Sequence, residues 1–246
     1  MSQFDIKNII LNSGQGWSVA KALINSNSTL YIKAITQSRQ KSQFTMNASQ
    51  EGRYRSPELK FQMQFMGILA EIFAQEFLIE IVESDSLISN CEVIRYDDVR
   101  TDGFRSPVNE YDLKIIAKNK NIEFTVESRS SIARDRSLKS AIEQFDIIGP
   151  YTSIAKSGEK LTDFFIRPLY EFVPFATQIY LPSNFKNHLE ANEINLYIVA
   201  GCTKNDMISN GYDKTMNQGG TLYRVVKITS GNDAKTFKKV ISDNIK

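Results

Sequence analysis

Two stretches of alternating polar and apolar residues, joined by a polar turn, constrain the fold of this chain most. Residues 108–131 read VNEYDLKIIAKNKNIEFTVESRSS, and residues 118–121 form the polar turn. Successive side chains of a strand point to opposite faces, so each stretch has one apolar and one charged face. The pattern predicts a β-hairpin around which the rest of the chain is organised.

The length of the turn decides which residues face each other across this hairpin. With residues 119–120 as a two-residue loop, Asp112 lies directly opposite Glu127. Cross-strand partners have Cβ atoms about 5 Å apart, so the two carboxylates converge. Arg129 lies two residues further along, and Lys114 lies diagonally from Glu127 on the same face. Two carboxylates this close repel each other, and Mg²⁺ or Mn²⁺, which prefer oxygen ligands, would relieve the repulsion.

The same alternation is typical of an ordinary amphipathic hairpin whose charged face contacts solvent. Spacing by itself therefore leaves both interpretations open. A one-residue slip in register would also separate the two carboxylates.

The segment EYDL, followed by a strand that reads apolar-Glu-x-basic-Ser-Ser, resembles the core of the PD-(D/E)XK nuclease superfamily, which includes many restriction endonucleases. The resemblance covers roughly residues 56–148. It implies that Asp112 matches the aspartate of the family and Glu127 its second acid. Arg129 stands where the family normally has lysine. Arginine stays protonated and cannot act as a base, although it can hold a phosphate.

A helix is expected over residues 57–82, with Ser56 as its cap and Pro57 at its first position. Glu71 is the charged residue in a stripe of small residues on this helix. The resemblance implies that a helix before the two strands supplies an additional glutamate near the metal, and Glu71 matches it. The alternative is a glutamate paired with an arginine at the edge of the core. One broad apolar face carries Phe61, Phe65, Ile68, Leu69, Ile72 and Phe73.

The first 55 residues are predicted to be an N-terminal extension, with residues 56–246 as the nuclease-like domain or the whole chain as one continuous domain. Within the extension we expect a short helix over residues 18–24 and a strand over residues 30–35. Residues 38–56 lack a hydrophobic period and predict a loop. This loop suits either a flexible arm against nucleic acid or a solvated surface. Its basic residues are Arg39, Lys41, Arg53 and Arg55, interleaved with Phe44 and Tyr54.

After the hairpin, residues 133–148 have apolar residues at helical spacing, and Gly149-Pro150 ends this predicted helix. Helix N-termini attract phosphate, and nearby cations would add to that attraction. Gln144 lies on the polar side and is a candidate substrate contact. The cations at the start of the helix are Arg134, Arg136 and Lys139.

The remaining segments complete an α/β fold with a central mixed sheet flanked by helices, a sandwich like that of restriction endonucleases. Residues 213–220 predict a polar loop and residues 236–245 a short amphipathic helix. The strands expected besides the hairpin are residues 91–99, 177–181, 196–200 and 222–228.

Composition limits the function classes. Hydrophobic residues make up 41% of the chain and charged residues 24%, as in ordinary soluble proteins. A net charge of +2 permits nucleic-acid binding through a local patch rather than through a global field. Cys91 and Cys202 form no CxxC pair, and His188 is the single histidine, which disfavours structural zinc and histidine-dependent catalysis. No apolar run is long enough to span a bilayer, so we expect a cytoplasmic protein.

Together these observations predict a metal-dependent phosphodiesterase, an endonuclease acting on DNA with Mg²⁺ or Mn²⁺. The resemblance makes a role in restriction or phage defence natural, and a homodimer or a partner protein of a defence system would fit it. The alternative is a non-catalytic module, a nuclease fold that lost its lysine and now holds nucleic acid or a partner protein.

Overall fold

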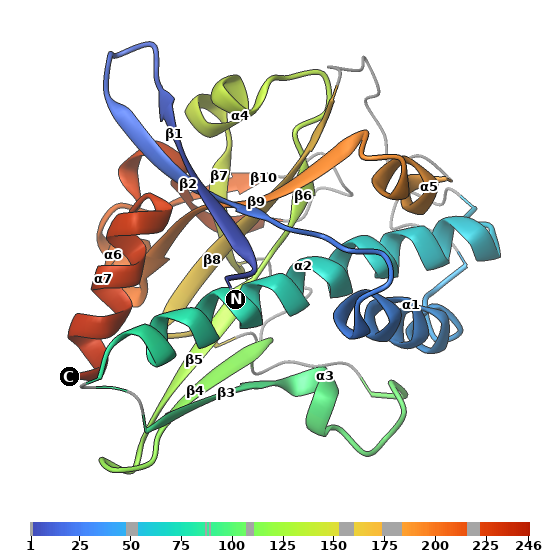
Figure 1. The fold of residues 1–246 in the computed structure, drawn as a ribbon, viewed down its shortest axis with the longest axis horizontal. Helices are drawn as coiled ribbons and strands as arrows, with labels where there is room; N and C mark the ends of the chain where they lie inside the picture. Colours follow the sequence, from blue (N-terminus) through green and yellow to red (C-terminus); the bar gives the residue numbers. More distant parts are fainter. Residues whose placement is uncertain are drawn as a thin grey trace.

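A mixed sheet of eight strands, flanked by helices, forms the centre of this computed structural model (Figure 1). The structure describes residues 2–47, 54–86, 88, 90–106, 111–152, 160–173, 184–215 and 222–246. The predicted fold class, a mixed α/β sandwich, is confirmed.

The main sheet places the predicted hairpin between other strands. Strands β5 and β6 run parallel to β8, and every other pairing in the sheet is antiparallel. The spatial order is β1 (Phe4–Ile10), β2 (Gly16–Ala22), β9 (Ile194–Thr203), β8 (Phe164–Phe172), β5 (Ile122–Ser128), β4 (Leu113–Ala117) and β3 (Cys91–Arg95), with β6 (Ser131–Ile132) beside β8. A second sheet has the order β10 (Tyr212–Thr215), β11 (Leu222–Lys227) and β7 (Asp146–Tyr151).

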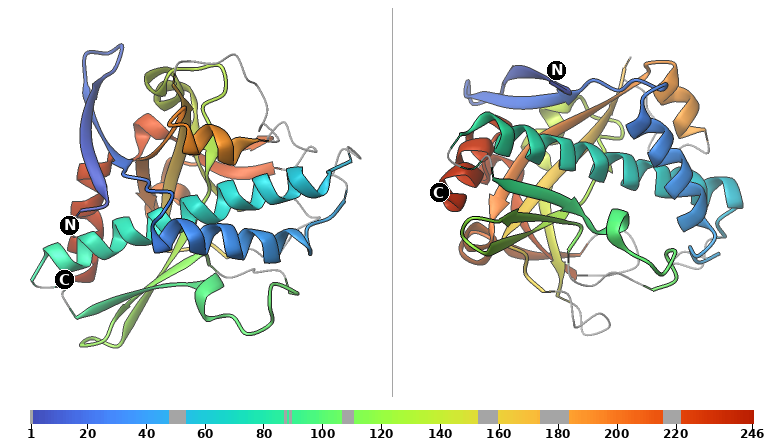
Figure 2. Two further views of the ribbon diagram at one scale, coloured as in Figure 1. Left: turned by 45° about the vertical axis from the view of Figure 1, so that its right-hand side comes forward. Right: turned by 60° about the horizontal axis from the view of Figure 1, so that its bottom comes forward.

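Helices cover both faces of the main sheet, and α1 packs along α2 (Figure 2). One core cluster lies between the sheet and α2, α5 and α7; the other lies between the sheet and α4, α6 and the second sheet. The helices are α1 (Thr29–Ser42), α2 (Pro57–Ser84), α3 (Tyr96–Val99), α4 (Leu138–Gln144), α5 (Phe185–Glu190), α6 (Lys204–Ser209) and α7 (Ala234–Ile245), with a 3₁₀ turn at Ile228–Ser230.

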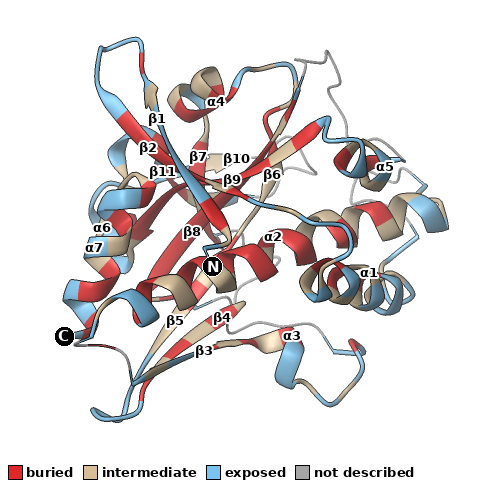
Figure 3. Ribbon diagram, viewed as in Figure 1, coloured by how far each residue is buried: buried red, intermediate tan, exposed pale blue. Residues whose placement is uncertain are grey.

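Helix α2 forms as its sequence predicts. The Ser56 side chain accepts a hydrogen bond from the Leu59 amide at 3.1 Å, and Pro57 follows as the first helical residue. Buried residues recur along most of the helix, and both of its ends are exposed (Figure 3). Within the described residues, no helix combines the length and the hydropathy needed to cross a membrane.

The two central strands change register at one point. Arg167 pairs with Ala200 and Pro168 pairs with Ile198, so Val199 is an extra residue in β9. Such a bulge tolerates a proline within a strand, because the missing N–H falls where the ladder is already interrupted. The Val199 carbonyl instead accepts a hydrogen bond from the Trp17 indole at 2.8 Å.

The predictions for residues 18–24 and 30–35 were wrong. Residues 18–22 belong to β2, and residues 30–35 belong to α1, which continues into the predicted loop as far as Ser42. Strand β2 is buried on both faces, so it lacks the alternation that identifies a strand. The start of α1 is fixed by Ser28, whose hydroxyl accepts a hydrogen bond from the Tyr31 amide at 3.2 Å.

The helix predicted over residues 133–148 is shorter than expected. It ends at Gln144, and Gly149 and Pro150 lie inside β7, an edge strand of the second sheet where proline is tolerated. A Cβ at Gly149 would lie 2.9 Å from the backbone carbonyl oxygen of Arg224 on β11, so the close contact between β7 and β11 favours glycine. Residues 96–99 are helical rather than extended, and residues 213–215 lie in β10 rather than in a loop.

The other strand predictions had mixed outcomes. Strands were correctly predicted within residues 91–95, 196–200 and 222–227, and so was the last helix, which begins two residues earlier than expected. The strand predicted at residues 177–181 lies outside the described residues.

Two glycine-to-alanine substitutions should shift stability in opposite directions. A Cβ at Gly201 would lie 2.3 Å from the Phe237 ring, so Gly201→Ala should lower the free energy of unfolding by about 1–3 kcal/mol through overpacking of α7 on β9. A Cβ at Gly67 would meet nothing within 4 Å, so Gly67→Ala should raise it by about 0.5–1 kcal/mol through helix propensity. Urea unfolding followed by circular dichroism measures both, and shifts of the same sign would contradict this packing.

Candidate functional site

The hairpin brings Asp112 close to Glu127. The ladder ends at the pair Leu113–Val126; Asp112 precedes this pair on one strand and Glu127 follows it on the other. The Asp112 amide donates to the Val126 carbonyl at 3.2 Å, and the Asp112 carboxylate accepts from the Ser128 amide at 2.8 Å. The ladder ends at Ala117, so the connection spans the four residues 118–121 without changing the register.

Asp112 lies in an environment that disfavours its negative charge. Burial and the carboxylates of Glu127 and Glu71 raise the pKa of Asp112 well above its ordinary value, and the Ser128 amide and Arg129 oppose this only in part. Two carboxylates, one from β5 and one from α2, therefore act electrostatically on Asp112.

Glu71 has an arginine partner, as the alternative interpretation of this residue expected. The Glu71 side chain is 16% exposed and lies 3.4 Å from Nη1 of Arg95, which is completely buried on β3. Burial raises the pKa of Glu71, and the charges of Lys41 and Arg95 oppose this rise only in part. The ion pair and the electrostatic contact with Asp112 occur together, so Glu71 belongs both to the edge of the core and to the carboxylate site.

Arg129 is held by Glu127 and by two aromatic rings of the second sheet. Its Nε donates to the Glu127 carboxylate at 2.6 Å. Its guanidinium lies over the rings of Tyr151 and Tyr223, 4.8 Å and 5.3 Å from their centroids. The side chain thus connects the end of β5 to strands β7 and β11.

Lys114 points along the hairpin rather than toward the two facing acids. Its ammonium lies 2.7 Å from the Glu123 carboxylate and 4.8 Å from the centroid of the Tyr111 ring. The hydrogen bond to Glu123 raises the pKa of Lys114. In this arrangement the Lys114 ammonium contacts Glu123 of β5 and the Tyr111 ring.

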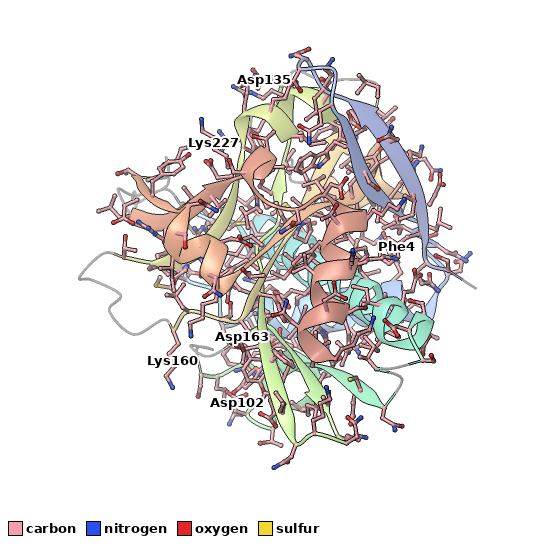
Figure 4. All side chains as sticks on the ribbon, turned by 90° about the vertical axis from the view of Figure 1, so that its left-hand side faces the viewer. Phe4, Asp102, Asp135, Lys160, Asp163 and Lys227 are labelled. Carbon is pink, nitrogen blue, oxygen red and sulfur yellow. The ribbon has the colours of Figure 1, made fainter. Side chains whose placement is uncertain are left out.

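The basic residues around α4 lie away from the loop that follows α3. Asp135, which stands between Arg134 and Arg136, lies at the opposite end of the view from Asp102, in the loop after α3 (Figure 4). Arg136 donates to the Asp135 carboxylate and to the Gln144 amide oxygen, each at 2.8 Å. Gln144 in turn donates to the Ser140 hydroxyl at 2.8 Å.

Two backbone amides at the start of α4 are already engaged by side chains of the protein. The helix has only seven residues, and its Leu138 amide already donates to the Glu171 carboxylate at 2.7 Å. The Ser140 amide is satisfied by the capping Ser137 hydroxyl. Lys139 lies within α4, partly buried, beside this occupied end.

Of the four basic residues in the predicted N-terminal arm, Arg53 lies outside the described residues. The Arg55 amide donates to the Asn47 carbonyl at 2.7 Å, which joins the segment after α1 to the start of α2. Tyr54 beside it is 73% exposed.

The sequence did not identify a cluster of buried charges next to the carboxylates. Arg95 donates to Gln37 of α1 and to Asp98 of α3, and it lies 3.8 Å from Asp97. Lys41 of α1 lies 2.9 Å from Asp97. The signal in the sequence was Arg95, followed by Asp97 and Asp98, within the strand predicted over residues 91–99.

Carboxylate oxygens are the ligands that a divalent cation such as Mg²⁺ prefers. The candidates here are Asp112, just before β4, Glu127 of β5 and Glu71 of α2, and both glutamates act on the charge of Asp112. In the conformation described, Glu127 and Glu71 turn to arginines, and no group of three or more acidic, cysteine or histidine side chains is arranged as a metal cage among the residues that were searched.

Comparison with known proteins finds a relative whose function its name does not state. No family model matches the chain, and no solved structure matches it. The chain is similar to Uncharacterized protein MJECS01 of Methanocaldococcus jannaschii, with 26% identity over 212 residues, which covers 79% of this chain and 75% of the relative. The likeness extends far beyond the hairpin, and the name of the relative states no activity.

Proposed function

We propose that this protein is a metal-dependent DNA endonuclease of the PD-(D/E)XK type, which hydrolyses phosphodiester bonds with Mg²⁺ or Mn²⁺. The observation that carries the proposal is the convergence of Asp112, Glu127 and Glu71, in which burial and mutual repulsion leave Asp112 short of positive charge. Arg129 beside these carboxylates supplies a cation for a phosphate.

Each residue has a defined task in this reaction. Asp112, Glu127 and Glu71 would hold the cation, which when bound activates a water and offsets charge on the phosphate. Arg129 would stabilise the negative charge that builds on the phosphate oxygens. The water oxygen forms a bond to phosphorus as the ester P–O bond breaks, the water loses a proton, and the leaving oxygen gains one.

A non-catalytic binding module is the second candidate, and one observation favours it. Glu127 and Glu71 already have arginine partners, so protein cations compensate two of the three carboxylates. Incubation of the purified protein with supercoiled plasmid, with Mg²⁺ or with EDTA, separates the two functions. The enzyme nicks the plasmid only with Mg²⁺, whereas the binding module gives a gel shift and no nicking.

The cellular context is part of the same proposal. Both cysteines are free thiols, which suits a reducing compartment such as the cytoplasm. A nuclease of this type fits restriction or defence against phage, acting as a homodimer or with a partner protein of such a system.

Removal of one facing carboxylate should abolish cleavage without harming the fold. We expect Asp112→Asn and Glu127→Gln each to lower the cleavage rate by more than about 100-fold, since even loss of a residue behind a metal ligand costs about 10–100-fold. Mn²⁺ binding, measured by calorimetry, should weaken in both variants. The thermal midpoint should stay equal or rise in Asp112→Asn, because a repulsion is relieved, and should change little in Glu127→Gln, where loss of the ion pair with Arg129 offsets that relief. Glu123→Gln, a hairpin carboxylate paired with Lys114, is the control and should keep wild-type cleavage.

The two hairpin cations should differ in importance. Arg129→Lys keeps a charge beside Glu127 and should retain or raise activity, whereas Arg129→Ala should remove most of it. Lys114→Ala should remain near wild type, because that ammonium is engaged by Glu123. Steady-state cleavage rates decide the question, and a greater loss in the Lys114 variant would reverse the assignment.

Binding of DNA should depend on salt through a local basic patch. About four phosphate contacts predict a slope of about −3.6 for log K against log salt on duplex DNA. Arg134→Glu and Arg136→Glu should each flatten the slope by about one unit and weaken all sequences alike. Fluorescence anisotropy measures the slope. Lys118→Glu, the same charge change at the far turn of the hairpin, serves as the control, and equal slopes for all variants would rule out a patch at Arg134–Arg136.

A further inference from the structure

Helix α1 carries two lysines that form matching ion pairs with consecutive aspartates of α3. Lys33 lies 2.7 Å from Asp98, and Lys41 lies 2.9 Å from Asp97. The two pairs have the same chemistry and join the same two helices.

The surroundings of the two lysines differ. The Asp97 side chain is 4% exposed and also lies 3.8 Å from Arg95, the guanidinium that binds Glu71. Burial lowers the pKa of Lys41, but the charges of Glu71, Asp97 and Asp112 outweigh it and raise the pKa. Contacts of 2.9 Å from Lys41 to Asp97, 3.8 Å from Asp97 to Arg95 and 3.4 Å from Arg95 to Glu71 connect this lysine to the carboxylates of the proposed metal site.

The other cations near these carboxylates are less suited to reach a substrate. Arg95 has no exposed surface, and Arg129 donates to Glu127 and stacks on aromatic rings. Lys114 is engaged at the turn half of the hairpin. Lys41 keeps 28% of its side chain exposed while it lies among the acids. It combines access to solvent with electrostatic contact to Glu71 and Asp112.

We propose that Lys41 is a catalytic residue of the carboxylate site, placed by α1 so that its ammonium donates hydrogen bonds to a non-bridging oxygen of the phosphodiester. This inference rests on the proposed nuclease function. It assigns to the N-terminal part of the chain a direct role in the reaction rather than a role in DNA affinity alone. The lysine acts as a fixed charge and transfers no proton.

The matched pair of lysines provides the experiment. Lys41→Met and Lys33→Met each remove one ion pair between α1 and α3 in the full chain. Lys41→Met should lower kcat by about 100-fold or more and leave KM within about threefold, as loss of one preorganised donor to developing charge does. Lys33→Met should leave both within about twofold, since exposed ion pairs contribute little.

A second readout does not depend on activity. Mn²⁺ binding, measured by calorimetry without DNA, should be unchanged or tighter in Lys41→Met, because one positive charge near the carboxylates is removed. Lys41→Arg restores a phosphate-binding cation and should recover at least about tenfold of the lost kcat. The arginine variant also covers the case in which the methionine variant folds poorly.

The outcomes separate the two proposals. Equal kcat for Lys41→Met and Lys33→Met, in a wild-type protein that cleaves DNA, overturns the role of Lys41 and leaves the nuclease function standing. Loss of Mn²⁺ binding in Lys41→Met also overturns it, because the lysine would then only hold the carboxylates in place. A wild-type protein that neither binds Mn²⁺ nor cleaves overturns the nuclease function and this role with it.

Discussion

The buried guanidinium of Arg95 is the interaction on which the arrangement of this site depends. A charge without exposed surface requires partners, because desolvation costs several kcal/mol unless ion pairs and hydrogen bonds replace the water. Arg95 obtains them from Gln37 of α1, Glu71 of α2 and Asp98 of α3. One side chain of β3 thereby ties three helices to the edge of the sheet that carries the carboxylates.

The difference between local signals and contacts with distant segments explains why sequence patterns predicted α2 and the hairpin but not α1 and β2. Helix α2 carries its own cap and first-turn proline, and the hairpin carries its own alternation, so local rules suffice for both. Strand β2 is buried on both faces by segments from distant parts of the chain. The sequence of α1 resembles that of a loop because its polar residues Lys33, Gln37 and Lys41 bind partners about 60 residues away in the chain.

The residues of the site also differ in whether local sequence or distant contacts place them. The proximity of Asp112 to Glu127 follows from the pairing of the adjacent residues Leu113 and Val126, a register that the sequence specifies over a few residues. Arg95 and Lys41 reach the carboxylates only because α1 packs on α2 and β3 pairs with β4, and neither contact has a local signal. The sequence left two interpretations of Glu71, a partner of an arginine or a glutamate near the other carboxylates. The structure combines them, since Glu71 pairs with Arg95 and also acts on the charge of Asp112.

The three carboxylates are compensated unequally, and this asymmetry locates the place where a further cation is most favourable. Glu71 pairs with Arg95 and Glu127 pairs with Arg129. Asp112 accepts the Ser128 amide but forms no ion pair within the described ranges. A cation that enters beside Asp112 would gain from all three charges. Because Arg129 also rests on the rings of Tyr151 and Tyr223, it can keep a partner while Glu127 turns toward that cation.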